Sequence, residues 1–112
     1  MNKEKIQKVI KKMLKDNKDI KSVVKVDGVE VSITEEYYFT YPVDKYLWSL
    51  GKDYSGGIYI YYYPSRETRS EFLRFGPEEL DYSAQEDLRS LMEVVRGKLY
   101  DFDEVIDDIL GV

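Results

Sequence analysis

Apolar residues recur with a helical period at both ends of the chain. In residues 3–16 they fall at i, i+3, i+4, i+7 and i+8, which predicts an amphipathic helix. Near the carboxyl end, Ser83–Glu86 has the form of a capping box, and the apolar stripe after it predicts a second helix. Asp101 or Asp103 offers a start for a further helical turn. The pattern leaves open whether these last two helices are continuous.

The segment after the first helix has the pattern of a β-hairpin. Asp27–Gly28 is the pair that a two-residue type I′ turn favours, so residues 20–35 are predicted to form two paired strands. That turn sets Val24 opposite Val31 and places both on one face of the sheet. The second strand is expected to continue until Pro42 ends it.

A short helix and a second hairpin are predicted next. Residues 43–50 carry apolar side chains at helical spacing, and Gly51 follows them, which favours a short helix. Residues 57–63, GIYIYYY, are β-branched and aromatic and lie between glycine and proline, as is typical of a strand. Residues 71–75 are the expected antiparallel return strand.

The order α-β-β-(α)-β-β-α-α predicts one α+β domain that spans residues 1–112. Short connections make the paired strands antiparallel. Helices on one face of such a sheet bury its apolar side. We therefore expect an antiparallel sheet of about four strands with the helices packed on one face.

Strand alternation gives this predicted sheet two unlike faces. Ile58 and Ile60 should point toward the helices, together with Val24 and Val31. The opposite face then gathers Tyr38, Tyr59, Tyr61, Tyr63 and Phe72, with Arg74 among the rings. A contiguous aromatic face is typical of a protein interface, either with a second copy or with another protein. The alternative is that the rings cover one another. On the interface hypothesis, Tyr59, Tyr61 and Tyr63 are needed for association and dispensable for folding.

Composition narrows the chemistry. The chain has 112 residues and contains no cysteine and no histidine, which excludes disulfides, Cys/His zinc sites and histidine-based triads. No nucleophile or phosphate-loop motif is present, so we expect a protein that is not an enzyme and uses no cofactor or metal. Asparagine and glutamine are scarce and charges are many, which fits a thermophilic source.

Charge is divided unevenly along the chain. Residues 1–27 carry nine lysines against four acidic residues, a net +5, whereas the remainder carries eight basic and eighteen acidic residues, a net −10. The lysines Lys8, Lys12 and Lys15, together with the tyrosine-rich sheet, form the alternative hypothesis of a nucleic-acid-binding module. Few cations lie among the rings, so protein is the preferred partner.

Two further groups of charged residues are candidates for binding. Arg66 and Arg69, beside hydroxyl residues in a polar loop, form a weak candidate for an anion site. Asp103, Asp107 and Asp108 lie near the carboxyl end and are a candidate docking surface for a basic partner. Their spacing does not fit a calcium-binding loop, which needs glycine at position 6 and glutamate at position 12.

The sequence thus favours a non-enzymatic protein-binding module, of the broad kind that includes inhibitors, immunity proteins, chaperones and viral anti-defence proteins. We expect a homodimer. The amino terminus lacks a continuous apolar stretch, and no segment is apolar enough to span a membrane, so the expected location is cytoplasmic. The identity of the partner is not encoded in any motif.

Overall fold

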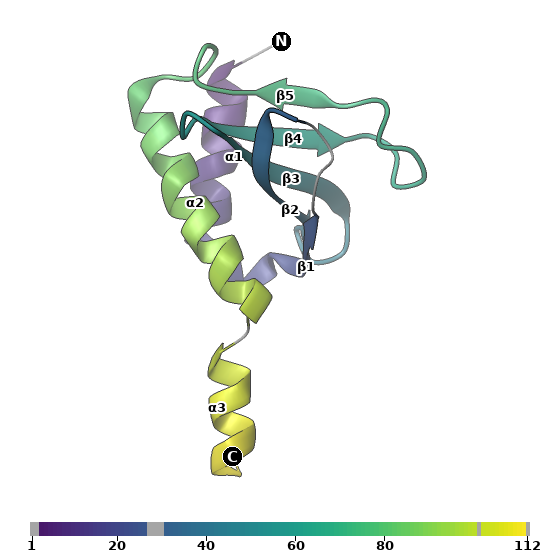
Figure 1. The fold of residues 1–112 in the computed structure, drawn as a ribbon, viewed down its shortest axis with the longest axis vertical. Helices are drawn as coiled ribbons and strands as arrows, with labels where there is room; N and C mark the ends of the chain where they lie inside the picture. The colour runs from purple at the N-terminus through teal and green to yellow at the C-terminus, as the bar shows by residue number, and fades with distance from the viewer. Residues whose placement is uncertain (1–2, 27–30, 101, 112) are drawn as a thin grey trace.

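The computed structural model describes residues 3–26, 31–100 and 102–111, and it has the predicted α+β fold (Figure 1). The elements in chain order are α1 (Lys3–Lys15), the 3-10 turn η1 (Asn17–Asp19), β1 (Lys21–Val26), β2 (Ile33–Tyr41), β3 (Tyr46–Asp53), β4 (Ile58–Tyr63), β5 (Leu73–Phe75), α2 (Tyr82–Tyr100) and α3 (Phe102–Leu110). The five strands form one antiparallel sheet in the order β1-β2-β3-β4-β5. Each strand therefore pairs with its neighbours in the sequence.

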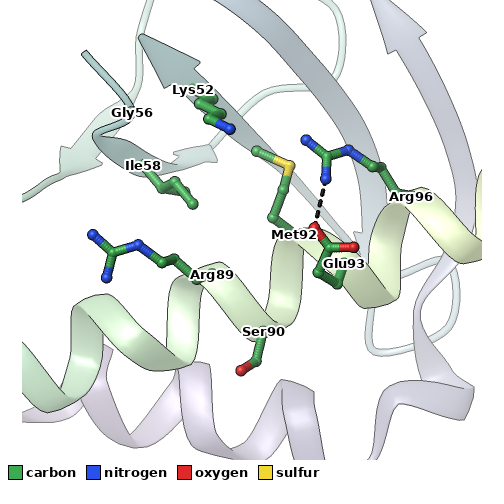
Figure 2. Close-up of a pocket in the computed structure, with 8 residues that line it drawn as sticks. All are labelled: Lys52, Gly56, Ile58, Arg89, Ser90, Met92, Glu93 and Arg96. Carbon is green, nitrogen blue, oxygen red and sulfur yellow. Dashed lines mark hydrogen bonds and ion pairs between the residues drawn. The ribbon is translucent and has the colours of Figure 1, made fainter. Parts of the chain in front are cut away.

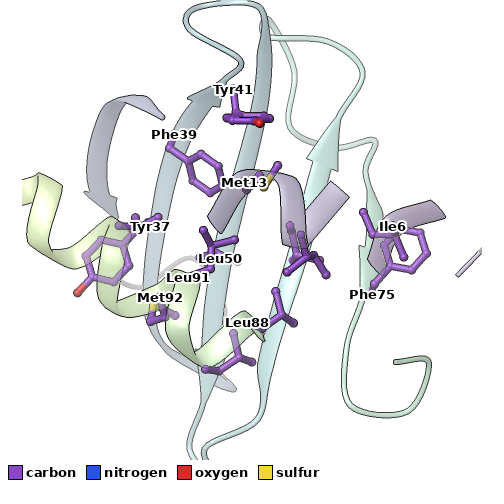
Figure 3. Close-up of a cluster of buried hydrophobic side chains, with 14 of the residues drawn as sticks. Ile6, Met13, Tyr37, Phe39, Tyr41, Leu50, Phe75, Leu88, Leu91 and Met92 are labelled. Carbon is purple, nitrogen blue, oxygen red and sulfur yellow. The ribbon is translucent and has the colours of Figure 1, made fainter. Parts of the chain in front are cut away.

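Helices α1 and α2 pack side by side on one face of the sheet, as Figure 1 shows. The apolar stripe of α1 buries Ile10 and Met13 completely, and Leu88, Leu91 and Val95 of α2 are also fully buried. Two ion pairs, Lys3–Asp81 at 3.1 Å and Lys11–Asp87 at 3.0 Å, join the exposed edges of the two helices. These stripes meet the ring of Phe39 and its neighbours from the sheet (Figure 3).

The segment predicted as a short helix at 43–50 is instead strand β3, so the sheet has five strands rather than four. Residues 42–45 form the turn that reverses the chain after β2, with the Lys45 amide donating to the Pro42 carbonyl at 3.1 Å. Strand β3 lies in the middle of the sheet and buries side chains on both faces, Leu50 on one and Leu47 on the other. A strand buried on both faces loses its alternation, and its apolar spacing then imitates a helix.

The predicted register of the first hairpin is also wrong. Val24 pairs with Tyr38, and Val26 pairs with Glu36, so β1 lies much further along β2 than a two-residue turn would allow. The predicted turn at Asp27–Gly28 lies outside the described residues. Val24 is 55% exposed and Val31 is fully exposed, so neither belongs to the core. The shift places β1 against the aromatic segment of β2, which has far more apolar area to bury.

Two glycines offer matched tests of this packing. A Cβ at Gly76 would lie 2.3 Å from ring atoms of Tyr59, whereas a Cβ at Gly97, on α2, would meet nothing within 4 Å. We expect Gly76→Ala to lower the free energy of unfolding by about 1–3 kcal/mol, because the ring must move. Gly97→Ala should raise it by roughly 0.5–1 kcal/mol, because alanine favours the helix. Urea unfolding of both variants measures the difference, and effects of the same sign would contradict the packing at Gly76.

Candidate binding surfaces

The predicted aromatic face exists on the side of the sheet opposite the helices. Tyr38 and Tyr61 both pair in register with Ser49 of β3, one from each side, and Arg74 of β5 pairs with Tyr61. Because Ser49 is small, the rings on either side close over it, and the Tyr38 and Tyr63 ring centres lie 5.4 Å apart. The assignment of these tyrosines to one face is therefore correct.

The rings of this face are nevertheless mostly covered. Tyr38 is 7% exposed, and Tyr61 and Tyr63 are each 4% exposed. The loop between β4 and β5 supplies much of the cover. From this loop, the Arg69 guanidinium lies 4.3 Å above the Tyr38 ring, and Phe72 packs against Tyr61 and Tyr63. The expectation of an open aromatic surface is thus wrong for three rings, which form a second small core.

A buried polar network runs through this second core. Ser49 is fully buried, and its hydroxyl oxygen lies 2.9 Å from the Tyr63 hydroxyl. The Ser49 hydroxyl also donates a hydrogen bond to Glu36 Oε1 at 3.3 Å. Burial raises the pKa of Tyr63 well above its ordinary value, so the phenol stays neutral. Buried polar groups that bond to one another in this way fix a single arrangement of the rings. The network therefore has a structural role.

The two loop arginines do not form a common anion site with their neighbouring hydroxyls. Arg66 donates to the backbone carbonyl of Asp44, in the turn between β2 and β3. Arg69 instead covers Tyr38. The Thr68 hydroxyl bonds to Ser70 at 2.7 Å. Arg74, which was predicted among the rings, lies 5.4 Å from the Tyr59 ring centre. These arginines hold the loop and the sheet edge in place.

The residues of the nucleic-acid hypothesis lie on opposite sides of the molecule. The lysines belong to α1, which packs on the helix-bearing face, while the buried tyrosines lie on the other face of the sheet. Lys12 also pairs with Asp16 at 2.6 Å. Because Lys8 and Lys15 share that helix, the described residues form no continuous surface that combines them with the rings. The geometry therefore removes the main support for this hypothesis.

Helix α3 projects beyond the end of α2, away from the sheet (Figure 1). Ile106, Ile109 and Leu110 are spaced to share one side of this helix, and they are 37%, 73% and 69% exposed. The predicted acidic residues Asp107 and Asp108 are exposed between them. Asp103 belongs to the same helix, but its side chain lies outside the described part. An unshielded apolar stripe flanked by acids is the clearest exposed binding feature among the described residues.

One further surface, an aromatic cleft, was not predicted from the sequence, because the strand that carries it was predicted to be a helix. Tyr46 and Trp48 of β3 and Tyr62 of β4 line an open aromatic cleft of about 260 Å³. The Tyr62 ring centre lies 5.0 Å from Trp48 and 6.2 Å from Tyr46. The Trp48 indole donates to the Tyr41 carbonyl at 3.1 Å, which fixes the wall of the cleft. The alternating aromatic residues at 46 and 48 were the signal that could have revealed it.

An ion pair joins α2 to the sheet at the β2 residue Glu35. Arg96 contacts both carboxylate oxygens of Glu35, at 2.6 and 2.7 Å, and the Tyr37 hydroxyl donates to the same carboxylate. Hydrogen bonding from Arg96, with a further contribution from Tyr37, lowers the pKa of Glu35 to about 2. Arg96 also pairs with the far more exposed Glu93.

Acid should weaken the ion pair between Glu35 and Arg96 over a defined range of pH. The folded pKa of Glu35 lies below its ordinary value of 4.5, so the stabilisation is complete above about pH 4.5 and is lost as the pH falls toward 2. Glu35→Gln should therefore lower the free energy of unfolding by about 1–2 kcal/mol at pH 7, given its partial exposure, and by much less at pH 2.5. Urea unfolding at both pH values tests this. Glu93→Gln is the control and should have little effect; a Glu35→Gln deficit independent of pH would contradict the assignment.

No protein-family model, curated protein or solved structure matches this chain. Within the described residues, no group of three or more acidic, histidine or cysteine side chains is placed to hold a metal ion. None of the helices described is both long and apolar enough to cross a lipid bilayer. A functional proposal must therefore stand on the surfaces themselves.

Proposed function

We propose that this protein is a non-enzymatic protein-binding module and that α3 is its principal binding element. The observation that supports this is the exposed stripe of Ile106, Ile109 and Leu110 on a helix that stands away from the body. A helix of nine residues is marginal in water by itself, and packing of its apolar side against a partner would stabilise it. Amphipathic helices of this kind bind proteins by laying the apolar side in a groove.

The aromatic face contributes less to this function than its composition suggests. Tyr61 and Tyr63 are buried within the chain, so they have little area to offer a partner. Phe72, at 42% exposed, and Val24 remain accessible at its margin. They are secondary candidates for contact. Asp107 and Asp108 beside the α3 stripe favour a partner surface with basic residues around an apolar groove.

One such surface is present in the chain itself. The cleft of Tyr46, Trp48 and Tyr62 is apolar, and the Lys45 ammonium lies 5.4 Å from the Tyr46 ring centre. Arg66 reaches the same turn by donating to the Asp44 carbonyl. An aromatic cleft with basic neighbours complements an apolar helix with acidic neighbours. We therefore propose a homodimer in which α3 of each copy lies in the cleft of the other, so that the contact occurs twice.

Multi-angle light scattering at tens of micromolar tests the homodimer. The chain mass is 13.2 kDa, and we expect the wild type to give twice this value. Ile109→Asp should give the monomer mass by placing a charge in the α3 stripe, and Tyr46→Asp should do so by charging the cleft. Tyr82→Asp adds the same charge at a 73% exposed position on α2 and should remain dimeric.

Mixing the two interface variants gives a sharper test. Tyr46→Asp retains an intact α3, and Ile109→Asp retains an intact cleft, so an equimolar mixture can form one of the two contacts. We expect partial recovery of the dimer mass in the mixture only. A dimer that is lost with Ile109→Asp but unaffected by Tyr46→Asp would preserve the role of α3 and refute the cleft as its site.

A monomeric wild type would refute the homodimer and leave a different protein as the partner. In that case, immobilised wild type should retain a protein from lysate of the source cells that Tyr82→Asp also retains and Ile109→Asp does not. A retained protein that binds all three equally would contradict the proposed role of α3.

A further inference from the structure

A pocket between α2 and the turn from β3 to β4 has a different character from the surfaces above. Its volume is about 270 Å³, the space of about nine water molecules at roughly 30 Å³ each. Figure 2 shows three cationic side chains around it, Lys52 from β3 and Arg89 and Arg96 from α2. Ile58 and Met92, both almost fully buried, form its apolar wall. Cations gather here although the whole chain has a net charge of −5.

The turn that follows Lys52 at the end of β3 is rigidly built. The Asp53 carboxylate accepts hydrogen bonds from the Ser55 amide at 3.0 Å and the Gly57 amide at 2.8 Å. Gly56 has φ of +91°, a conformation that favours glycine, and this allows the turn to close. These hydrogen bonds fix the backbone between Lys52 and Ile58, the two residues of this turn region whose side chains line the pocket. The backbone of Lys52, paired with Glu35 on one side and Ile58 on the other, therefore holds a well-defined position.

The three cations are not equally available to a ligand. Arg96 is committed to Glu35 and Glu93. For Arg89, the ion pair found among the described residues runs from Nη1 to the Glu86 carboxylate at 3.0 Å, and that pair is half exposed and so weak. Within the described part of the chain, Lys52 forms no direct ion pair. It lies opposite Glu35 in the sheet and its charge helps to lower the pKa of that carboxyl, but Arg96 is the group that pairs with Glu35 directly. Lys52 and Arg89 therefore leave positive charge and hydrogen-bond donors at the pocket, on either side of Ile58 (Figure 2).

We propose that this pocket binds a small phosphate ester, with the phosphate between Lys52 and Arg89 and the ester body on Ile58 and Met92. A guanidinium offers paired donors that match phosphate oxygens, and an ammonium adds a compact charge. Among the residues that the structure describes, Glu93 is the one carboxylate that lines the pocket, and Arg96 holds it at 2.6 Å. The volume limits the ligand to a small molecule.

Titration of ¹⁵N-labelled protein with phenyl phosphate at low salt tests the proposal. We expect saturable shifts confined to residues 52–58 and 89–96, weaker binding of inorganic phosphate, which lacks the apolar body, and no binding of benzyl alcohol, which lacks the charge. Lys52→Ala and Arg89→Met should each weaken phenyl phosphate binding by roughly tenfold, the effect of losing one charged hydrogen bond. Lys8→Ala removes the same charge from an exposed position on α1 and should leave the affinity unchanged.

Three results would overturn it. If Lys8→Ala weakens binding as much as Lys52→Ala, the interaction is general electrostatic attraction. If benzyl alcohol binds as well as phenyl phosphate, the pocket selects only an apolar body. If phenyl phosphate causes no saturable shift at these residues in the wild type, the pocket does not bind phosphate esters. Thermal unfolding of each variant checks its fold, and Arg89→Met is expected to fold because its side chain is 51% exposed.

Discussion

Tyr61→Ala should destabilise the domain strongly, by roughly 3–5 kcal/mol. The Tyr61 side chain is 4% exposed, its ring stacks with Tyr63 at 6.3 Å, and it meets Phe72 edge-on at 5.4 Å. Removing the ring leaves a cavity beneath the loop that covers this face. The free energy of unfolding of a domain of this size is about 5–15 kcal/mol, so the variant should lose a large part of its stability. Thermal unfolding should show a fall in Tm of at least about 10 °C.

The control for this prediction is another tyrosine. Tyr82→Ala removes a ring that is 73% exposed and should change the free energy of unfolding by less than about 0.5 kcal/mol. Tyr63→Phe removes only the hydroxyl that bonds to Ser49 and should cost about 1 kcal/mol. If Tyr61→Ala were as harmless as Tyr82→Ala, the aromatic face would be open in solution. The sequence-based hypothesis of an interface on that face would then be restored.

The fold class and most elements were predictable from the sequence because their signals are local. The helix at residues 3–16 and the strand at 57–63 were predicted within a residue or two of α1 and β4. The second helix begins at Tyr82, one residue before the predicted cap at Ser83. Its stripe is buried as expected, as Leu88 shows. The spacing of apolar residues, together with a proline or glycine at the ends, is sufficient to predict elements of this kind.

The errors in the fold arise from tertiary context. Strand β3 is covered on both faces, so its apolar residues do not alternate with polar ones, and Leu47 and Leu50 fall at a spacing that also fits a helix. The turn signal at Asp27–Gly28 suggested a tight hairpin, yet β1 pairs with the later, aromatic part of β2, where Val24 meets Tyr38. A turn motif fixes a register only where no other pairing buries more apolar area.

The candidate sites were predictable only in part for the same reason. Alternation placed Tyr61 and Tyr63 correctly on one face, but it contained no information about the loop that folds over them. A further helical turn starting at Asp101 or Asp103 was predicted, whereas the projection of α3 from the body was not. The pocket proposed to bind a phosphate ester combines Lys52 and Arg89, 37 residues apart in the chain. No local pattern links two such residues, so only the packing of α2 against the sheet brings them together.

Phe39→Ala should have an effect as large as that of Tyr61→Ala, on the opposite face of the same sheet. Phe39 is fully buried in the main core, among side chains from α1, α2 and the central strands (Figure 3). Loss of a fully buried phenylalanine ring costs roughly 3–5 kcal/mol. Leu73→Ala is the matched control, because Leu73 is 39% exposed. It should cost less than about 1 kcal/mol in urea unfolding.

Phe39→Ala also tests whether the two cores form one cooperative unit. Tyr38 and Phe39 are adjacent on β2 and point into different cores, so the same backbone supports both. Weakening the main core should therefore speed amide hydrogen exchange in β4, beneath the tyrosines, as much as in α1. Faster exchange confined to α1 would show that the aromatic core persists when the helices open. The β4–β5 loop and its rings would then be an independently stable layer.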